Sequence, residues 1–346
     1  MSDVTTHERP GVYSAYDASS VVDSTAGNKR VAIVAARGGG EGGEVYELTR
    51  YEQAAAQFGA EDRLTRLVQL LFLNGAAAVV ALPVAGEEGY AKAFETVAQR
   101  EDIGVVLCDS TLTSVQQALR DSVENASQSR YERVGVVCGG AKESVSELVA
   151  RAQSINHARM VLVAPCESEE SGATAAAAVA GAIAATSDPA VPLGGAELRG
   201  VTKLNARYNE NELDQLIQGG VTVLESVGGV VSVIRGVTTK TKSGDAVDNT
   251  WRELTTILIV DDVIPAIRNS LRAKFRRAKN TAQSRGAIRS QVILELENKL
   301  SAEIITGYDD VTVTAKEDDP TVCLVDFSFM VTHGINQIWL TAHITV

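Results

Sequence analysis

The 346-residue sequence predicts an α/β protein, in which a mostly parallel, doubly wound sheet is followed by a smaller α+β C-terminal part. Continuous apolar runs alternate with stretches of helical period between residues 31 and 185, a pattern typical of a parallel sheet buried on both faces. After residue 250 two helical patterns precede segments that alternate apolar and polar residues, which indicates strands. Together these patterns predict two packed units in one chain.

The middle of the chain supplies the predicted parallel sheet. Its expected strands are Val31–Ala36, Ala77–Val84, Ile103–Cys108, Val134–Cys138 and Met160–Ala164. The helical stretches that alternate with them cover residues 63–73, 90–99, 114–124, 142–153 and 173–185. Prolines and glycines in residues 187–208 predict a long surface crossing. A short helix at 212–217 and a pair of strands within 221–239 follow, and the polar segment 240–250 forms a boundary.

The C-terminal block opens with the β-branched segment Leu254–Val260, which is expected to be extended. Asp261 or Asp262 is expected to cap a helix after it, with Pro265 in the first turn, where a missing N–H costs little. The apolar face of this helix repeats at three- and four-residue spacing through Val263, Ile264, Ile267, Leu271 and Phe275.

A second helix is expected from about Ala282 to near Gly307, because apolar residues recur every four positions and glycine often ends a helix. Two strands around a turn at residues 318–320 come next. The segment Ile338–Val346 then alternates apolar and polar residues up to the last residue. This alternation predicts a final strand.

A row of positive charge lies beside the apolar face of the first C-terminal helix. Its members are Arg268, Arg272, Arg276 and Lys279, and the stretch from Val263 to Arg289 contains no acidic residue. The whole chain has a formal charge of -12, which argues against nucleic acid as the main partner. The row is either a solvated helix face or a contact surface for an acidic partner.

Three stretches resemble the contractile tail sheath proteins of phage tails, R-type bacteriocins and contractile injection systems. They are ERPGVY at residues 8–13, ELDQLIQGGVTVL at 212–224 and the whole block 251–346. The middle of the chain is similar only in being a variable α/β region. None of the stretches is a catalytic signature, so the specificity of the resemblance comes from their order and joint presence.

The resemblance implies four regions: an N-terminal extended arm at 1–28, an outer α/β domain at 29–248, a C-terminal sheath domain at 249–337 and a C-terminal strand arm at 338–346. It implies a structural subunit, in stacked hexameric rings around a tail tube, that contracts to drive the tube through a target envelope. The implied partners are further copies of the chain, the tube protein, and baseplate and tail terminator proteins. Assembly in the bacterial host cytoplasm, before release in a particle or retention in a cell-held device, is also implied, without nucleic acid or membrane insertion.

The resemblance also implies roles for the ends of the chain and for the basic row. Arm residues that would pair with neighbouring subunits are Val12, Tyr13 and Tyr16, together with Ile338, Leu340, Ala342, Ile344 and Val346. The residues alone also allow two other interpretations: the N-terminal segment could be a flexible terminus, and the last strand could pair within its own subunit. The basic row would face an acidic tube surface.

An enzyme is the alternative interpretation, carried by Gly38, Gly40 and Gly43, which fit G-x-G-x-x-G after the first strand. The signal is weak, because no helix opens at the third glycine to hold a pyrophosphate. The segment at Cys138 is read as a strand end followed by a helix cap. The four cysteines occur singly and the four histidines lack ligand spacing, so no metal, cofactor or catalytic residue is expected. No stretch is long and apolar enough to span a bilayer, and no signal peptide is expected.

Overall fold

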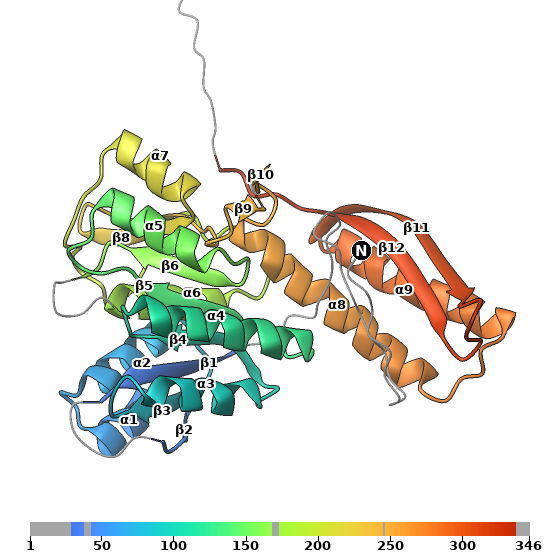
Figure 1. Ribbon diagram of the computed structural model, residues 1–346, viewed down its shortest axis with the longest axis horizontal. Helices are drawn as coiled ribbons and strands as arrows, with labels where there is room; N and C mark the ends of the chain where they lie inside the picture. Colours follow the sequence, from blue (N-terminus) through green and yellow to red (C-terminus); the bar gives the residue numbers. More distant parts are fainter. Residues whose placement is uncertain (1–28, 38–42, 168–172, 245, 337–346) are drawn as a thin grey trace, which may run out of the picture.

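A long helix, α8 (Leu254–Phe275), connects a large α/β body to a smaller helix–hairpin unit in the computed structural model (Figure 1). The structure describes residues 29–37, 43–167, 173–244 and 246–336. Among these residues no helix is both long enough and apolar enough to cross a membrane.

The large body is built on an eight-stranded sheet in the order β2-β3-β1-β4-β5-β6-β7-β8. Pairing is parallel from β3 through to β7, and the two edge strands are antiparallel. The strands are β1 (Arg30–Ala36), β2 (Tyr46–Leu48), β3 (Val79–Val84), β4 (Ile103–Cys108), β5 (Val134–Cys138), β6 (Met160–Ala164), β7 (Val221–Val227) and β8 (Val230–Arg235). The predicted parallel sheet is therefore confirmed, and the short edge strand β2 is an addition to it.

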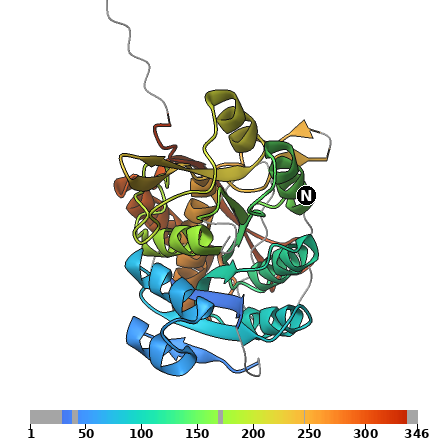
Figure 2. The same ribbon diagram turned by 90° about the vertical axis from the view of Figure 1, so that its left-hand side faces the viewer.

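Helices cover both faces of the sheet, as a doubly wound fold requires (Figures 1 and 2). Alternate residues of β1 enter the two hydrophobic clusters, with Ile33 in one and Val34 in the other. One face packs against α1 (Tyr51–Phe58), α2 (Arg63–Leu73), α6 (Ala173–Ala185) and the first half of α8. The other packs against α3 (Gly89–Ala98), α4 (Thr113–Gln128), α5 (Val145–Ile155) and α7 (Glu210–Gln218). These positions confirm the predicted helices α2 to α7, whereas α1 and the first half of α8 were not predicted as helices.

The alanine-rich helix α6 is buried along almost its whole length between α2 and the sheet. Its small side chains allow close approach of backbones, which bulky residues would prevent. At Gly181 an added Cβ would lie 2.7 Å from the carbonyl oxygen of Leu71 and 2.9 Å from the Cβ of Asn74. The low side-chain volume of α6 is thus a packing requirement.

Residues 187–208 cross the surface between α6 and α7, as the sequence predicted, and many of them are exposed, but three apolar side chains anchor the segment. Leu193, Leu198 and Val201 are buried, and the Leu198 N–H donates to the Val231 carbonyl at 2.8 Å. The segment follows β8 and supplies hydrogen-bond partners for its outer edge. The unpaired backbone groups of an edge strand explain why a segment rich in proline and glycine is held there.

The expected extended segment at residues 254–260 is wrong, because α8 already begins at Leu254. All residues from 254 to 263 are buried, so tertiary packing overrides the strand preference of the β-branched side chains. Asp261 and Asp262 therefore do not cap the helix, and Pro265 lies in its interior, where the Asp261 carbonyl receives no N–H from it. The predicted apolar face is confirmed by burial of Val263, Ile267 and Leu271.

Helix α9 (Ala282–Ser301) begins where the sequence predicted, with Thr281 accepting from the Ser284 N–H at 3.2 Å. It ends before Gly307 because Glu303 adopts a φ of 58°. The Ile304 N–H donates to the Lys299 carbonyl and the Glu303 N–H to the Leu300 carbonyl, both at 3.0 Å. This pair of bonds is a Schellman motif without glycine.

Two hairpins complete the described chain. The small hairpin of β9 (Lys242–Ser243) and β10 (Ala246–Val247) lies in the polar segment before α8. The long hairpin of β11 (Ile305–Ala315) and β12 (Cys323–Val331) packs on α9 and turns at the predicted place.

Replacing Gly181 by alanine should destabilise the protein by about 1–3 kcal/mol, because the new methyl group overpacks against the backbone of α2. The matched control is Gly286→Ala in α9, where no atom lies within 4 Å of the added Cβ. That change should stabilise by up to about 1 kcal/mol through helix propensity. Urea unfolding measures both free energies, and equal effects of the two changes would contradict the packing argument.

Candidate functional site

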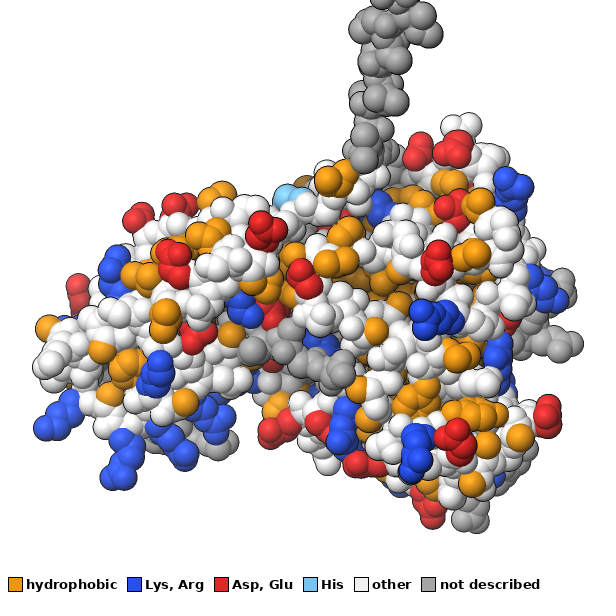
Figure 3. Space-filling view, turned by 180° about the vertical axis from the view of Figure 1, so that it is seen from behind, with side chains coloured by type: hydrophobic (Ala, Val, Ile, Leu, Met, Phe, Trp, Pro, Cys, Tyr) orange, Lys and Arg blue, Asp and Glu red, His pale blue; other side chains and the backbone are white. Residues whose placement is uncertain are grey.

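The predicted basic row lies at the free end of the smaller unit. Arg272 is exposed on α8, Arg276 is exposed directly after the last helical residue, and Lys279 lies in the connection to α9. Figure 3 shows Lys and Arg side chains gathered at this end of the molecule. Arg277, which the sequence reasoning did not single out, joins them there. We call Arg272, Arg276, Arg277 and Lys279 the basic end.

Arg268 does not belong to the basic end, contrary to its place in the predicted row. Its side chain is only 9% exposed, and its Nη2 donates to Glu132 Oε1 at 2.6 Å. Glu132 precedes β5, so this arginine faces the sheet of the large body. Regular spacing placed Arg268 on the correct face of the helix, but it could not show that the large body covers this part of the face.

No residue of the basic end has a carboxylate partner within the described part of the chain. The neighbouring Lys274 donates to the side chain of Gln291 instead. These four cations, which have no carboxylate partner among the described residues, form a local patch of positive charge on a chain of net charge -12. Such a surface attracts an anionic partner over a distance set by salt, about 10 Å at 0.1 M.

The hairpin of β11 and β12 covers the helices beneath it only in part. On its inner face Val311 and Phe329 are buried, whereas other apolar side chains are half-buried. The half-buried residues are Tyr308, Val313, Val325, Phe327 and Val331. On the outer face Leu324 is 47% and Met330 53% exposed. A two-stranded sheet is too narrow for the apolar surface on which it rests.

Both outer edges of this hairpin also lack a strand partner among the residues that the structure describes. Unpaired N–H and C=O groups along a long edge can accept a further strand from another chain. The arm residues named for this role all lie outside the described residues: Val12, Tyr13, Tyr16, Ile338, Leu340, Ala342, Ile344 and Val346.

The alternative of a nucleotide site can be examined at the sheet edge where such sites form. The strand order places a topological switch point at the carboxyl ends of β1 and β4. Gly43, with a φ of 109°, ends the glycine loop, whose residues 38–42 lie outside the description. The next element is strand β2, so no helix N-terminus follows the glycines to bind a phosphate.

Asp109, directly after β4, is the buried charged group at this switch point. Its carboxylate accepts the Tyr90 hydroxyl at 2.5 Å and the Ala36 N–H at 3.2 Å, and it lies 3.3 Å from Arg63. These contacts tie together β1, β4, α2 and α3. Because every contact is internal, the aspartate holds the fold together at the position where an enzyme would bind its ligand.

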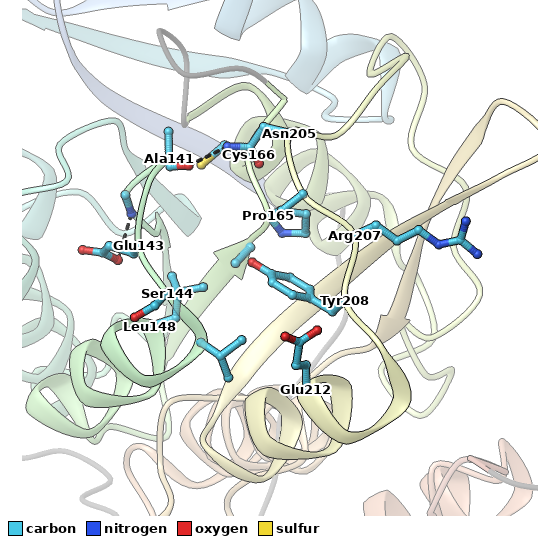
Figure 4. Close-up of a pocket in the computed structure, with 14 residues that line it drawn as sticks. Ala141, Glu143, Ser144, Leu148, Pro165, Cys166, Asn205, Arg207, Tyr208 and Glu212 are labelled. Atoms are coloured by element: carbon cyan, nitrogen blue, oxygen red, sulfur yellow. Dashed lines mark hydrogen bonds between the residues drawn. The ribbon is translucent and has the colours of Figure 1, made fainter.

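A cavity of about 280 Å³ lies at the carboxyl ends of β5 and β6 (Figure 4). The N-terminus of α5 at its rim is closed by Ser144 and Glu147 in a capping box, as the sequence predicted for a cap. Glu143 and Glu212 also line the cavity, and their charge opposes a phosphate. Burial raises the pKa of Cys166 to about 11, so its thiol is not a nucleophile at neutral pH. Arg207 also lines the cavity, but its guanidinium points away from the other labelled side chains (Figure 4).

Cys108, Cys138 and Cys166 are buried free thiols, and Cys323 is half-buried. No group of three or more His, Cys, Asp or Glu side chains that could hold a metal ion occurs among the described residues.

The buried Asp109 and the partly exposed Glu124 should respond to pH in opposite directions. Burial raises the pKa of Asp109 above 3.8, so the stability of the wild type relative to Asp109→Asn should fall as the pH rises above 3.8. The hydrogen bond from His157 lowers the pKa of Glu124 from 4.5 to about 2. The advantage of the wild type over Glu124→Gln should therefore be present above pH 4.5 and decline towards pH 2.

Urea unfolding across this pH range measures both differences. Parallel pH trends for the two variants would contradict the assignment of Asp109 as a carboxylate dominated by burial.

Comparisons with known proteins agree with the architecture. The family profile of the phage tail sheath protein central domain matches residues 84–239, and that of the phage tail sheath C-terminal domain matches residues 246–345. The tail sheath protein of Bacillus phage SP01 is 30% identical over 270 residues, which are 71% of this chain and 43% of that protein. The chain thus spans less than half the length of this relative.

Solved structures are similar over almost the whole chain. The helical sheath of the anti-feeding prophage in its contracted state gives a TM-score of 0.72 at 13% identity, covering 98% of this chain and 99% of that one. The sheath tail protein of Desulfitobacterium hafniense gives 0.68 at 12% identity, covering 93% and 100%. At this identity the similarity concerns the fold.

Proposed function

Because the chain belongs to the phage tail sheath protein family, we propose that it is the sheath subunit of a contractile tail. In this proposal the subunits form stacked hexameric rings around a tail tube. The rings contract to drive the tube through a target envelope. The observation that carries the proposal is the narrow hairpin of β11 and β12, which leaves apolar side chains half-buried and two edges unpaired among the described residues. A nucleotide-binding enzyme remains the weaker candidate, because its loop precedes a strand.

The hairpin becomes a complete sheet when strands from neighbouring copies add to its edges. We assign this role to the C-terminal segment 338–346 and to the arm around Val12, Tyr13 and Tyr16. Nine residues can form roughly four or five ladder hydrogen bonds, each contributing about 0.5–1.5 kcal/mol. Burial of Ile338, Leu340 and Ile344 adds apolar stabilisation. Such links keep subunits connected while their packing changes.

Deleting residues 339–346 should abolish tubes and leave a soluble monomer that melts cooperatively, since the deleted strand pairs with another copy. Negative-stain microscopy detects the tubes, and circular dichroism follows folding and melting. A truncated chain that unfolds or aggregates places the strand in the core of its own subunit. Tubes formed without it exclude the linked-arm mechanism.

The basic end is assigned to the interface with the tube in the extended state. Its exposed cations fit an acidic tube surface, and each contact contributes about 1 kcal/mol or less because solvent and salt screen it. Repetition over many subunits makes the sum large. Arg268 shares the sequence spacing of these residues but does not belong to this interface, because it pairs with Glu132 inside the subunit.

Reversing Arg272 and Arg276 to glutamate should reduce the yield of extended particles and leave folding and contracted tubes intact. The matched control reverses Lys316, whose nearest acidic partner is Asp318 at 3.1 Å in the exposed hairpin turn. Microscopy of particles assembled at low and high salt counts the two states. An unchanged yield of extended particles in the double reversal excludes the tube contact.

The other partners follow from the same assembly. Baseplate proteins contact the first ring and a terminator contacts the last, and assembly takes place in the cytoplasm of the bacterial host. The complete particle is then released, as a virion or bacteriocin, or held by the cell as an injection device.

A further inference from the structure

Two buried ion pairs connect α8 to the large body at the beginnings of β5 and β6. Asp261 Oδ2 accepts from Arg159 Nη1 at 2.5 Å, and the two side chains are 1% and 2% exposed. Two turns further along, Arg268 pairs with Glu132. Arg159 directly precedes β6, and Glu132 lies two residues before β5.

The charges of these two pairs are in crossed order. Asp261 and Arg268 are seven residues apart, so they lie on one face of the helix, about 10.5 Å from each other along its axis. This face carries a negative and then a positive charge. The strand beginnings opposite it carry a positive charge at Arg159 and a negative one at Glu132. We call the contact formed by Arg159, Asp261, Glu132 and Arg268 the joint. If α8 slid along its axis so that Asp261 approached Glu132, two carboxylates would lie opposite each other in this poorly solvated contact, which is unfavourable.

Stability alone does not explain these pairs. A buried ion pair can often be replaced by apolar side chains of similar volume without loss of stability. The apolar residues of α8 already anchor its first half in the core. Asp261 Oδ1 has no hydrogen-bond partner among the described residues, so the carboxylate is not fully satisfied by its site. What the crossed charges add is discrimination between registers.

We propose that Arg159, Asp261, Glu132 and Arg268 are positioning residues that fix the register of α8 on the large body. Displacement of the basic end is then transmitted to the sheet without slipping of the helix. The register assignment rests on the ion pairs; its mechanical role rests on the proposed sheath function.

The test measures the position of α8 directly in the full chain. Spin labels at Ser129→Cys and Ala273→Cys, both exposed sites, report the distance between the large body and the end of α8. Cys323→Ser removes the half-buried thiol, and the other three cysteines are buried. Two double variants alter the joint. Arg159→Met with Asp261→Leu removes one ion pair. Arg159→Asp with Asp261→Arg gives the helix two positive charges and the strand beginnings two negative charges. The control replaces the exposed pair Lys316 and Asp318 by Met and Leu.

The wild type and the control should give one narrow distance. At least one of these two variants should melt cooperatively and show a second population displaced by about 10.5 Å, the seven-residue slide that brings position 261 opposite Glu132. A single unchanged distance in every folded joint variant overturns the proposal. So does failure of both variants to fold, because the pairs then serve folding itself.

Tube formation by the same proteins separates the register from its mechanical role. A displaced distance with loss of tubes supports both. A displaced distance with normal tubes supports the register assignment and removes its mechanical role. If the wild type forms no tubes under any condition, the proposed function fails while the distances still decide the register.

Discussion

Burial of the first half of α8 is the interaction on which the rest of the structure depends. Its apolar residues between Leu254 and Val263 lie in the same hydrophobic cluster as the central strands, and that cluster continues through α9 to Phe329 in the hairpin. Full burial of one Leu or Ile side chain contributes about 1.5–3 kcal/mol, so a helix buried on all sides is held firmly. The last turn of α8, which carries the exposed Arg272, can therefore project into solvent and still keep a defined direction.

The sequence predicted the elements whose signal is long and local. Continuous apolar runs identified β1, β4, β5 and β6, and helical period identified most of the helices. The errors arose where distant packing decides the outcome. Residues 254–260 prefer strands by composition but are surrounded by the core, and β2 has only three residues and no pattern to detect. Glu303 takes the left-handed conformation that was expected near a glycine.

The surfaces were less predictable than the fold. The helical spacing of the charged residues identified the face that carries Arg268 and Arg272. It could not show that Arg268 is buried while Arg272 is exposed, because this depends on the position of Glu132. Alternation predicted both strands of the hairpin but not how many neighbours they have. One signal was available in advance: charged residues inside apolar runs, such as Arg159 before β6 and Asp261 within α8, mark positions where burial demands a partner.

The incomplete hairpin has a consequence for the size of any assembly built from it. Each copy that donates a strand fills one hairpin edge of the next copy, and its own hairpin edge accepts a strand from the copy before it. Strand pairing between copies therefore has no built-in end. A finite stack consequently finishes with copies whose edges are unfilled. In the proposed strand exchange, length control therefore comes from other proteins that present a matching strand or cover the last edge. Free subunits in solution are prone to aggregate, because an exposed strand edge lies next to half-buried apolar side chains. Rapid incorporation into the assembly protects them from aggregation.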